Sequence, residues 1–308
     1  MKWSEADADL QAVKRFLADM SGSDLNTLLL DVFQEKIQRT KASELLKRYD
    51  LNRFVRPASL DPVALKKLEL LALSIAGANK FTPLQLSPAA PLGSCSVVAA
   101  VDQNKVISAL RGTEIASDPT NALALHMASL LKSGQMSNDP DDIRFCTTHR
   151  VVRAQHFGNN PRLLPHFHLF CMVTSGKDKG SYEFEASSFW EHIAVYKELF
   201  QAHLQTDVSV KLQLRGGYKN PEDLAAAIVR HGEKAAPATA IESVPGISDN
   251  AYYNGVQFTL TISAGGQSQA IGDGGFVNWT QTLLGSKKER LLISGIGLDR
   301  LVNVAAMS

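Results

Sequence analysis

The sequence lacks several features that would assign it to a class of protein at once. Its 308 residues include three cysteines, Cys95, Cys146 and Cys171, which are widely spaced and form no CxxC pair. We therefore expect no disulfide framework and favour a reducing compartment. No apolar run approaches the roughly 18 residues of a membrane helix. Thirty-two Lys plus Arg against 31 Asp plus Glu give a net charge of +1, so no global basic field indicates a nucleic-acid partner.

The N-terminus also lacks the pattern of a targeting peptide. Glu5, Asp7, Asp9 and Asp19 place four negative charges in its first twenty residues, which contradicts a signal or transit peptide. The composition, 44% hydrophobic and 20% charged, is typical of a globular protein. We therefore expect a soluble, cytoplasmic protein with no membrane partner.

Residues 1–80 have the periodicity of helices. Apolar residues at three- and four-residue spacing predict one helix after Ser4, a second from Asp24 to about Leu46, and a third that begins at Asp61-Pro62. In the second helix the residues expected to face inward are Leu25, Leu28, Leu29, Val32 and Phe33. These residues are predicted to form an N-terminal helical subdomain.

From residue 81 onward the pattern changes to strands with interspersed helices. Proline-rich residues 82–93 predict extended loop or edge backbone. Strands are predicted at Val97–Val101 and Val106–Leu110 as a hairpin, and at Arg144–Arg153, Phe167–Thr174, Val208–Leu214, Val256–Ile262 and Leu291–Ser294. Helices are predicted after Asp118, at Ser187–Leu204, at Pro221–His231 and from Leu298. This order favours an α+β fold with an antiparallel sheet.

Standard catalytic motifs are missing. The sequence has no GxxxxGK[ST] loop, no HExxH helix, no GxSxG and no strand-linked GxGxxG. His166 and His168 would share one face of a strand, a geometry that can bind a metal ion. Cys171 has the opposite parity, and no acidic ligand lies nearby in sequence. We therefore favour ordinary hydrogen-bonded histidines and predict no metal site.

Two arginines and two glycine-rich segments could approach a ligand. Arg153 and Arg300 each lie where an apolar strand or helix meets a loop, so either guanidinium could reach a phosphate with paired donors. A structural salt bridge is the alternative for each. Residues 272–275 and 295–297 are rich in glycine, which permits close approach of a ligand but serves tight turns and packing equally well.

Four segments occur in a characteristic order between about Ala109 and Val302. They are Leu110-Arg111-Gly112-Thr113-Glu114, residues 144–176, Tyr252–Phe258, and residues 271–301 with Ser294-Gly295-Ile296-Gly297-Leu298-Asp299-Arg300-Leu301 at their end. Together they resemble the catalytic core of class II aminoacyl-tRNA synthetases, most closely the histidyl branch. There they are similar to the LRPEGT turn, motif 2, the YYTGxxFE segment, and GGRYDGL followed by the GxGLERL of motif 3.

The resemblance implies a core over residues 81–308, built on an antiparallel sheet of six or seven strands flanked by helices. It implies ATP with Mg²⁺ as the cofactor, with Arg153 on the α-phosphate and Arg300 on the γ-phosphate as the catalytic residues. Such fixed donors would stabilise charge that develops around the α-phosphate. The cofactor-binding residues that it implies are Arg153, Gln155, Arg162, Phe167, Gly295, Gly297 and Arg300.

The substrate pocket departs from the family. The residues that the resemblance implies are Arg111, Thr113, Glu114, Leu169, Val173, Tyr252, Tyr253 and Gly274. Leu169 and Val173 stand where the family has a Gln and an acid, and Gln155 stands at the acidic position of motif 2. Thr113 stands where the glutamate belongs, with Glu114 one place later, and the arginine upstream of the paired tyrosines is missing. A buried ammonium would lack its carboxylate partners, so we expect a more apolar pocket and a substrate other than histidine.

Three functions are compatible with this pattern. Motif 3 ends within eight residues of Ser308, so no anticodon-binding domain is expected. The chain could bind ATP and activate another carboxylate as an adenylating ligase. It could instead be a non-catalytic regulatory or scaffold protein, similar to the regulatory subunit of ATP phosphoribosyltransferase. The near-neutral charge disfavours the third function, a tRNA-binding or tRNA-modifying protein. By resemblance, a homodimer is expected through the helix Pro62–Ile75 and the strand near Phe81–Leu86, with a small molecule or a protein as further partner.

Overall fold

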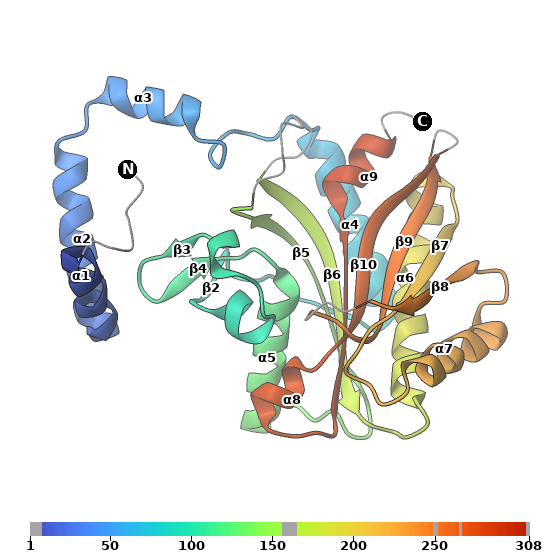
Figure 1. Ribbon diagram of the computed structural model, residues 1–308. Coiled ribbons are helices and arrows are strands. Elements are labelled where there is room, and N and C mark those ends of the chain that lie inside the picture. Colours follow the sequence, from blue (N-terminus) through green and yellow to red (C-terminus); the bar gives the residue numbers. More distant parts are fainter. Residues whose placement is uncertain (1–7, 156–164, 249–251, 265–266, 306–308) are drawn as a thin grey trace.

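A large, mostly antiparallel sheet forms the centre of the protein (Figure 1). The structure is a computed structural model that describes residues 8–155, 165–248, 252–264 and 267–305. The strands of the sheet, in spatial order, are β1 (Thr82–Pro83), β5 (Ile143–Val152), β6 (His166–Lys177), β11 (Glu289–Gly297), β10 (Gln267–Val277), β9 (Asn254–Ala264), β7 (Val208–Leu214) and β8 (Ile241–Ile247).

From β5 to β7 in this spatial order, each strand pairs antiparallel with the next. At the two edges, β1 pairs parallel with β5 and β8 pairs parallel with β7. The predicted α+β fold with an antiparallel sheet is therefore confirmed. The antiparallel part has the six strands of the lower predicted count, and the short β1 and the parallel β8 bring the sheet to eight strands over the described residues. β7 spans the predicted residues, β5 begins and ends one residue earlier than predicted, and β6, β9 and β11 extend their predictions by one to three residues at each end.

The sequence pattern did not predict strand β10. Its run Gly272-Asp273-Gly274-Gly275 gives a weak strand signal, because glycine is depleted in strands. The neighbouring backbone explains these glycines: a Cβ atom at Gly272 would lie 2.3 Å from the carbonyl oxygen of Gly295, and one at Gly275 would lie 2.7 Å from that of Val256. The glycines therefore allow β10 to pack closely between β9 and β11.

Helices cover both faces of the sheet (Figure 1). One apolar core lies between the sheet and the helices α4 (Pro62–Ala78), α6 (Glu183–Leu204), α7 (Pro221–Ala235) and α9 (Leu298–Ala305). A second, smaller core lies on the other face, against α5 (Pro119–Ser133) and α8 (Trp279–Leu284). Helices α4 and α5 begin where their proline signals predict, with the side chains of Asp61 and Asp118 as N-caps. No helix in the described ranges is both long and apolar enough to cross a bilayer.

A small three-stranded sheet replaces the predicted hairpin. It consists of β2 (Ala89–Pro91), β4 (Thr113–Ile115) and β3 (Ser108–Ala109), and the short helical turns η1 (Ser94–Val98) and η2 (Gln103–Lys105) lie between β2 and β3 along the chain. The prediction of strands at Val97–Val101 and Val106–Leu110 is therefore wrong. The buried carboxylate of Glu114 is the physical reason, because it accepts hydrogen bonds from the backbone N–H groups of Gly93 and Cys95, each at 2.9 Å, and so gathers this loop around itself.

The N-terminal helices form an arm that stands apart from the sheet (Figure 1). Its helices are α1 (Ala8–Asp19), α2 (Gly22–Gln38) and α3 (Ala42–Leu51), and we use "the arm" for residues 8–56. The single predicted helix from Asp24 to Leu46 is wrong, because α2 ends at Gln38 and Lys41 has an extended backbone. No residue of α2 or α3 is buried, so the prediction that the α2 stripe faces the core of its own chain is also wrong.

Two helical glycines should respond to alanine in opposite directions. In α7, a Cβ atom at Gly232 would lie 1.9 Å from Cζ2 of Trp190. Overpacking of this kind costs about 1–3 kcal/mol, so Gly232→Ala should lower the free energy of unfolding by that amount. In α4, Gly77 is exposed with nothing within 4 Å, so Gly77→Ala should instead raise it by about 0.5–1 kcal/mol. Urea unfolding of both variants tests this, and a loss of stability in both would contradict it.

A buried polar relay lies between the sheet and α6. The ring of His192 makes hydrogen bonds with the hydroxyls of Thr174, at 2.9 Å, and Ser294, at 2.7 Å, and the Tyr196 hydroxyl meets that of Ser294 at 2.8 Å. Burial lowers the pKa of His192 to about 3, with the positive charge of Arg144 adding to the effect. The imidazole is therefore neutral in the folded protein at every physiological pH.

This relay predicts a stability that falls in acid. Below the pKa of an unfolded histidine, about 6.5, the unfolded chain binds a proton at His192, whereas the folded chain does not. The stabilisation is complete above pH 6.5 and is lost as the pH falls toward 3, by up to about 5 kcal/mol. Urea unfolding between pH 4 and 7 should show a flatter pH dependence for His192→Gln than for the wild type. The matched control is His231→Gln, at an exposed histidine of α7, which should keep the wild-type slope.

Candidate functional site

A cavity of about 690 Å³ lies on the face of the sheet that carries the smaller core. Its floor is formed by Leu169 and Cys171 of β6, Gly295 of β11 and Asp273 of β10. In the sheet register Gly295 lies between Cys171 and Asp273, and a Cβ atom at this glycine would come within 3.0 Å of the Cys171 sulfur. The absence of a side chain at Gly295 thus keeps the centre of the floor open to a ligand.

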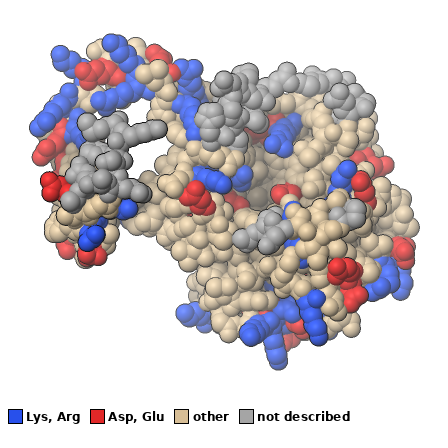
Figure 2. Space-filling model, viewed as in Figure 1, with Lys and Arg blue, Asp and Glu red and all other residues tan. Residues whose placement is uncertain are grey.

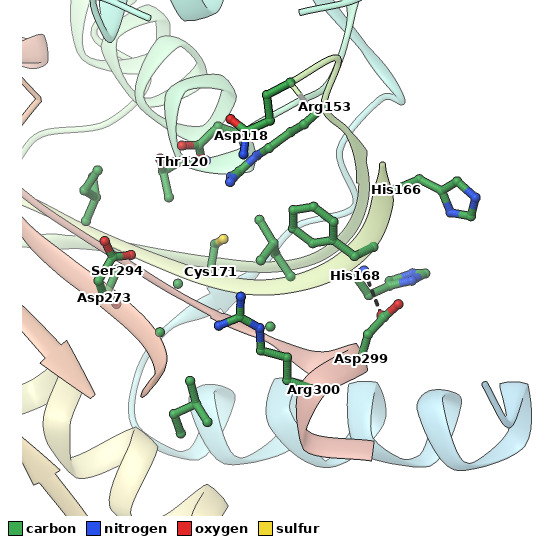
Figure 3. Close-up of a pocket in the computed structure, with 18 of the residues that line it drawn as sticks. Asp118, Thr120, Arg153, His166, His168, Cys171, Asp273, Ser294, Asp299 and Arg300 are labelled. Atoms are coloured by element: carbon green, nitrogen blue, oxygen red, sulfur yellow. Dashed lines mark hydrogen bonds between the residues drawn. The ribbon is translucent and has the colours of Figure 1, made fainter. Parts of the chain in front are cut away.

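Arg153 and Arg300 enter this cavity from opposite sides (Figure 3). Arg153 follows the end of β5, where its Nε donates a hydrogen bond to the carbonyl oxygen of Ser117 at 2.9 Å and its guanidinium stands 5.2 Å from the centre of the Phe167 ring. Arg300 lies in the first turn of α9 and donates from Nη1 to the carbonyl oxygen of Ala270 at 3.3 Å. Two oriented guanidinium groups facing one cavity suit the paired oxygens of a phosphate.

Two carboxylates, Asp118 and Asp273, face the same cavity. Asp118 caps α5 with one oxygen, which accepts from the backbone N–H and the hydroxyl of Thr120 at 2.9 and 2.7 Å, and its other oxygen accepts from the Tyr252 hydroxyl at 2.6 Å. Asp273 accepts from Nε2 of Gln257 at 3.3 Å. Neither was among the predicted pocket residues, and they correct the expectation of a more apolar pocket.

The two carboxylates repel each other. Burial raises the pKa of Asp273, the negative charge of Asp118 raises it further, and the positive charge of Arg153 and hydrogen bonds from Tyr253 and Gln257 oppose that rise. The repulsion between two like charges is relieved by a cation that binds between them. This end of the cavity is therefore suited to a positively charged group.

Two tyrosines complete the acidic end. Tyr252 and Tyr253 pack edge-to-face with ring centres 4.8 Å apart, and Tyr252 also packs edge-to-face on Trp279 at 5.5 Å. Burial raises the pKa of both hydroxyls well above the usual value, and Asp118 adds to the rise at Tyr252. Both hydroxyls therefore stay protonated and serve as donors to the carboxylates.

His166 and His168 form a structural cluster at the rim of the cavity. Arg150 donates to Nδ1 of both rings, with its shortest contacts at 2.7 Å to His166 and 3.1 Å to His168. A guanidinium can only donate, so each Nδ1 is an acceptor and the proton of each neutral ring lies on Nε2. Burial lowers the pKa of His168, although Glu69 at 3.5 Å opposes this. In the described parts of the chain no three His, Cys, Asp or Glu side chains are grouped so as to hold a metal ion.

The structure brings most of the predicted site residues together. Those that line the cavity are Arg153, Gln155, Phe167, Leu169, Tyr252, Tyr253, Gly295, Gly297 and Arg300. Arg162 lies outside the described residues. The predicted pocket residues that do not line the cavity are Arg111, Thr113, Glu114, Val173 and Gly274.

Packing explains why three of these predicted residues do not line the cavity. Glu114 is buried in the small sheet, where hydrogen bonds from Gln103, Gly93 and Cys95 outweigh its burial and lower its pKa. Val173 packs in the smaller core. A Cβ atom at Gly274 would point at the ring of Phe258, 2.4 Å away, on the opposite face of the sheet from the cavity. The sequence could have located Asp118. This residue stands immediately before the predicted helix that follows the turn at residues 110–114.

The six antiparallel strands, the covering helices and this cavity define the fold of class II aminoacyl-tRNA synthetase catalytic cores, as the resemblance implied. The histidyl-tRNA synthetase of S. aureus superposes with a TM-score of 0.59 at 11% identity, over 79% of this chain and 65% of that chain. An ATP phosphoribosyltransferase regulatory subunit/histidyl-tRNA synthetase from Bacillus halodurans C gives 0.61 at 13% identity, over 81% and 83%. A protein proposed to be the threonyl-tRNA synthetase ThrRS-1 of Aeropyrum pernix gives 0.60 at 13%, over 78% and 59%.

These likenesses establish the fold. The chain spans less than two thirds of the length of the two synthetases that it matches, and most of the length of the regulatory-subunit structure. No protein-family model and no curated protein sequence matches the chain. The function must therefore be argued from the cavity itself.

Proposed function

We propose that the protein binds ATP with Mg²⁺ and activates a carboxylate that carries an amino group, as an adenylating ligase. The observation that supports this is a single cavity in which two arginines face two carboxylates. Groups suited to a phosphate and groups suited to a cation then share one cavity. This arrangement fits a nucleotide and a zwitterionic acid side by side.

The arginine half suits the nucleotide. Arg153 is held by Ser117 and Phe167, so its guanidinium is oriented before a ligand arrives, and such preorganisation lowers the cost of binding. Mg²⁺ would be held mainly by the phosphates, as is usual for this ion, because the described residues offer no group of three ligands. This agrees with Gln155 at the position where the family has an acid.

The carboxylate half suits the substrate's amino group. Asp118 and Asp273 come from different elements, and hydrogen bonds from tyrosine hydroxyls help to fix both. A substrate ammonium between them would relieve their repulsion, and its attraction to them would offset the cost of removing it from water. An acid without an amino group would leave the pair uncompensated, which makes the two carboxylates determinants of specificity.

The proposed reaction needs positioning more than proton transfer. An oxygen of the substrate carboxylate attacks the α-phosphorus of ATP and forms the new P–O bond. The bond between the α-phosphorus and the bridging oxygen breaks, and pyrophosphate leaves. Arg153 and Arg300 stabilise the charge that develops on the phosphate oxygens, and the acidic pair holds the substrate in line.

Pyrophosphate exchange tests the proposal. The protein is incubated with ATP, Mg²⁺ and labelled pyrophosphate, together with each of the standard amino acids or with matched carboxylic acids that lack the amino group. We expect exchange with at least one amino acid and at least about a hundredfold less with its matched acid, since a buried unpaired charge costs several kcal/mol. Calorimetric titration that detects no ATP binding by the wild type would overturn the proposal.

One observation favours a second candidate, a regulatory protein. The regulatory subunit/histidyl-tRNA synthetase structure is covered over 83% of its length, whereas the two synthetases are covered over less than two thirds. Such a protein could bind its ligands without performing a reaction. Purification from the native host distinguishes the two candidates: a stable protein partner together with no exchange activity would favour regulation.

A further inference from the structure

The arm exposes an apolar stripe that its own chain does not cover. Phe16 is 65% exposed, Ile37 71% and Leu46 63%. The other large apolar side chains exposed on the arm are Val13, Leu28, Leu30, Val32, Phe33, Leu45, Tyr49, Leu51 and Val55. Many exposed apolar side chains on one segment mark an interaction site more often than a free surface.

Within this stripe, the apolar residues of α2 have the spacing of a helix that packs against a neighbour. In α2, Leu25, Leu28, Leu29, Val32 and Phe33 follow one another at intervals of three and one residues, the pattern of a core-facing helix. Helices of this length are marginal in water without a packed apolar face. Packing of the exposed side of α2 against a partner would therefore stabilise the arm.

Hydrogen bonds join the described residues of the arm to the rest of the chain. The backbone N–H of Arg111 donates to Oδ1 of Asn26 at 2.6 Å. At the other end of the arm, Arg53 donates to the carbonyl oxygens of Ala154, at 2.6 Å, and Gln155, at 3.0 Å. These bonds tie the arm to the rest of the chain, and its large apolar side chains remain exposed.

Charge divides the arm into two parts. Residues 8–35 carry two basic and five acidic residues, whereas residues 36–56 carry seven basic and two acidic residues. Figure 2 shows the Lys and Arg side chains gathered at the end of the arm that α3 forms. The ion pair between described arm residues is Arg39 with Glu35, exposed at 3.9 Å, which contributes little.

We infer that the arm is an interface for the arm of a second copy of this chain. Two arms related by a two-fold axis place the acidic part of each on the basic part of the other and bury both apolar stripes between them. A two-fold interface must be self-complementary, and one surface with an acidic part, a basic part and an apolar stripe meets this condition. A nucleic acid fits less well, because the acidic part would repel it and the stripe would stay exposed.

This inference does not depend on the proposed function and can fail or succeed without it. It also differs from a dimer through α4, so the test must report on the arms themselves. The three natural cysteines are free and buried, so a cysteine added to the arm is the exposed thiol of the full-length protein. Asp31 of α2 and Lys47 of α3 are exposed positions in the acidic and basic parts.

The first experiment is disulfide trapping between copies. Full-length Asp31→Cys and Lys47→Cys are mixed in equal amounts and oxidised mildly. We expect a cross-linked dimer in the mixture at several times the yield of either variant alone. The control replaces Lys47→Cys by Glu233→Cys, at an exposed position of α7, and should give no dimer above background. Equal cross-linking with the control variant would overturn the inference.

The second experiment is charge reversal read by sedimentation velocity at low salt. The double variants Asp31→Lys/Glu35→Lys and Lys47→Glu/Arg48→Glu should each associate at concentrations about tenfold or more above the wild type, because like charges then face each other. Mixing the two variants should restore association, since their charges are again complementary. No change in either variant, or retention of total tRNA on a filter through the basic part without arm-to-arm cross-linking, would overturn the inference.

Discussion

Arg153→Ala is expected to weaken the binding of ATP–Mg²⁺ by about a hundredfold or more in calorimetric titration. The wild-type guanidinium is oriented by Ser117 and Phe167 before the nucleotide arrives, so its replacement removes a preorganised, charge-assisted contact. Truncation of a buried charged contact costs about 2–5 kcal/mol, which is the basis of this magnitude. The side chain lies at the end of β5 and outside both apolar cores, so folding should be retained.

Two further variants separate charge from geometry. Arg153→Lys keeps the positive charge but loses the planar pair of donors, and we expect it to bind ATP with an affinity between those of wild type and Arg153→Ala. Arg230→Ala, at an exposed arginine of α7, is the control and should bind like the wild type. If Arg153→Ala binds ATP within twofold of the wild type, Arg153 does not contact the phosphates.

Asp118→Asn should lower kcat/KM for the amino-bearing substrate by about a hundredfold, because the ammonium loses one of its two carboxylate partners and truncation of one partner of a charge pair costs about 2–5 kcal/mol. Asparagine is as good an N-cap as aspartate, so α5 should be preserved. The binding of ATP, measured by calorimetry, should remain unchanged. A parallel loss of ATP binding would show that Asp118 acts on the nucleotide half of the cavity or on the fold.

Asp273→Asn should also reduce activity, but it should raise stability at pH 7. The pKa of Asp273 is raised in the folded protein, chiefly by burial and then by Asp118. The folded chain therefore holds this proton more tightly than the unfolded chain does, and stability is lost as the pH rises from the unfolded value, about 3.9. Removing the charge should abolish that loss, which urea unfolding at pH 4 and pH 7 can measure. A less stable Asp273→Asn protein at pH 7 would contradict this account.

The sequence predicted the regular elements well where the signal is local. The helix after Asp118 begins at its proline, and β7 spans the predicted residues, because capping and apolar alternation depend on neighbouring positions. Strand β10 was not predicted, because its glycines are required by the close approach of Gly295 and Val256 on the adjacent strands. The hairpin prediction failed for a similar reason. The loop is shaped by hydrogen bonds to the buried carboxylate of Glu114, which lies outside the predicted strands.

Of the charged residues of the site, the sequence singled out the two arginines but neither acid, although the predicted Tyr252 and Tyr253 do lie at the acidic end. Arg153 and Arg300 stood out through their positions beside apolar segments, and the structure places both at the cavity. The sequence did not single out Asp118 and Asp273 as site residues, because each had a sufficient local explanation. Asp118 was explained as a helix cap, and Asp273 was one residue in a glycine-rich run. Thr113 and Glu114, which the short LRPEGT-like segment suggested, do not line the cavity, because that segment belongs to the small sheet.

By itself, the sequence determined the α+β order, the starts of α4, α5, α7 and α9, the fold of the core and the two arginines, since these follow from periodicity, capping and short motifs read along the chain. Only the tertiary structure decided that Asp118 and Asp273 share a cavity with those arginines. It also decided that the arm's apolar stripe, so regular in sequence, faces away from its own core. The physical reason is the same in both cases: pairing across the sheet and between helices brings distant residues together, and no local pattern encodes which distant residue will be the neighbour.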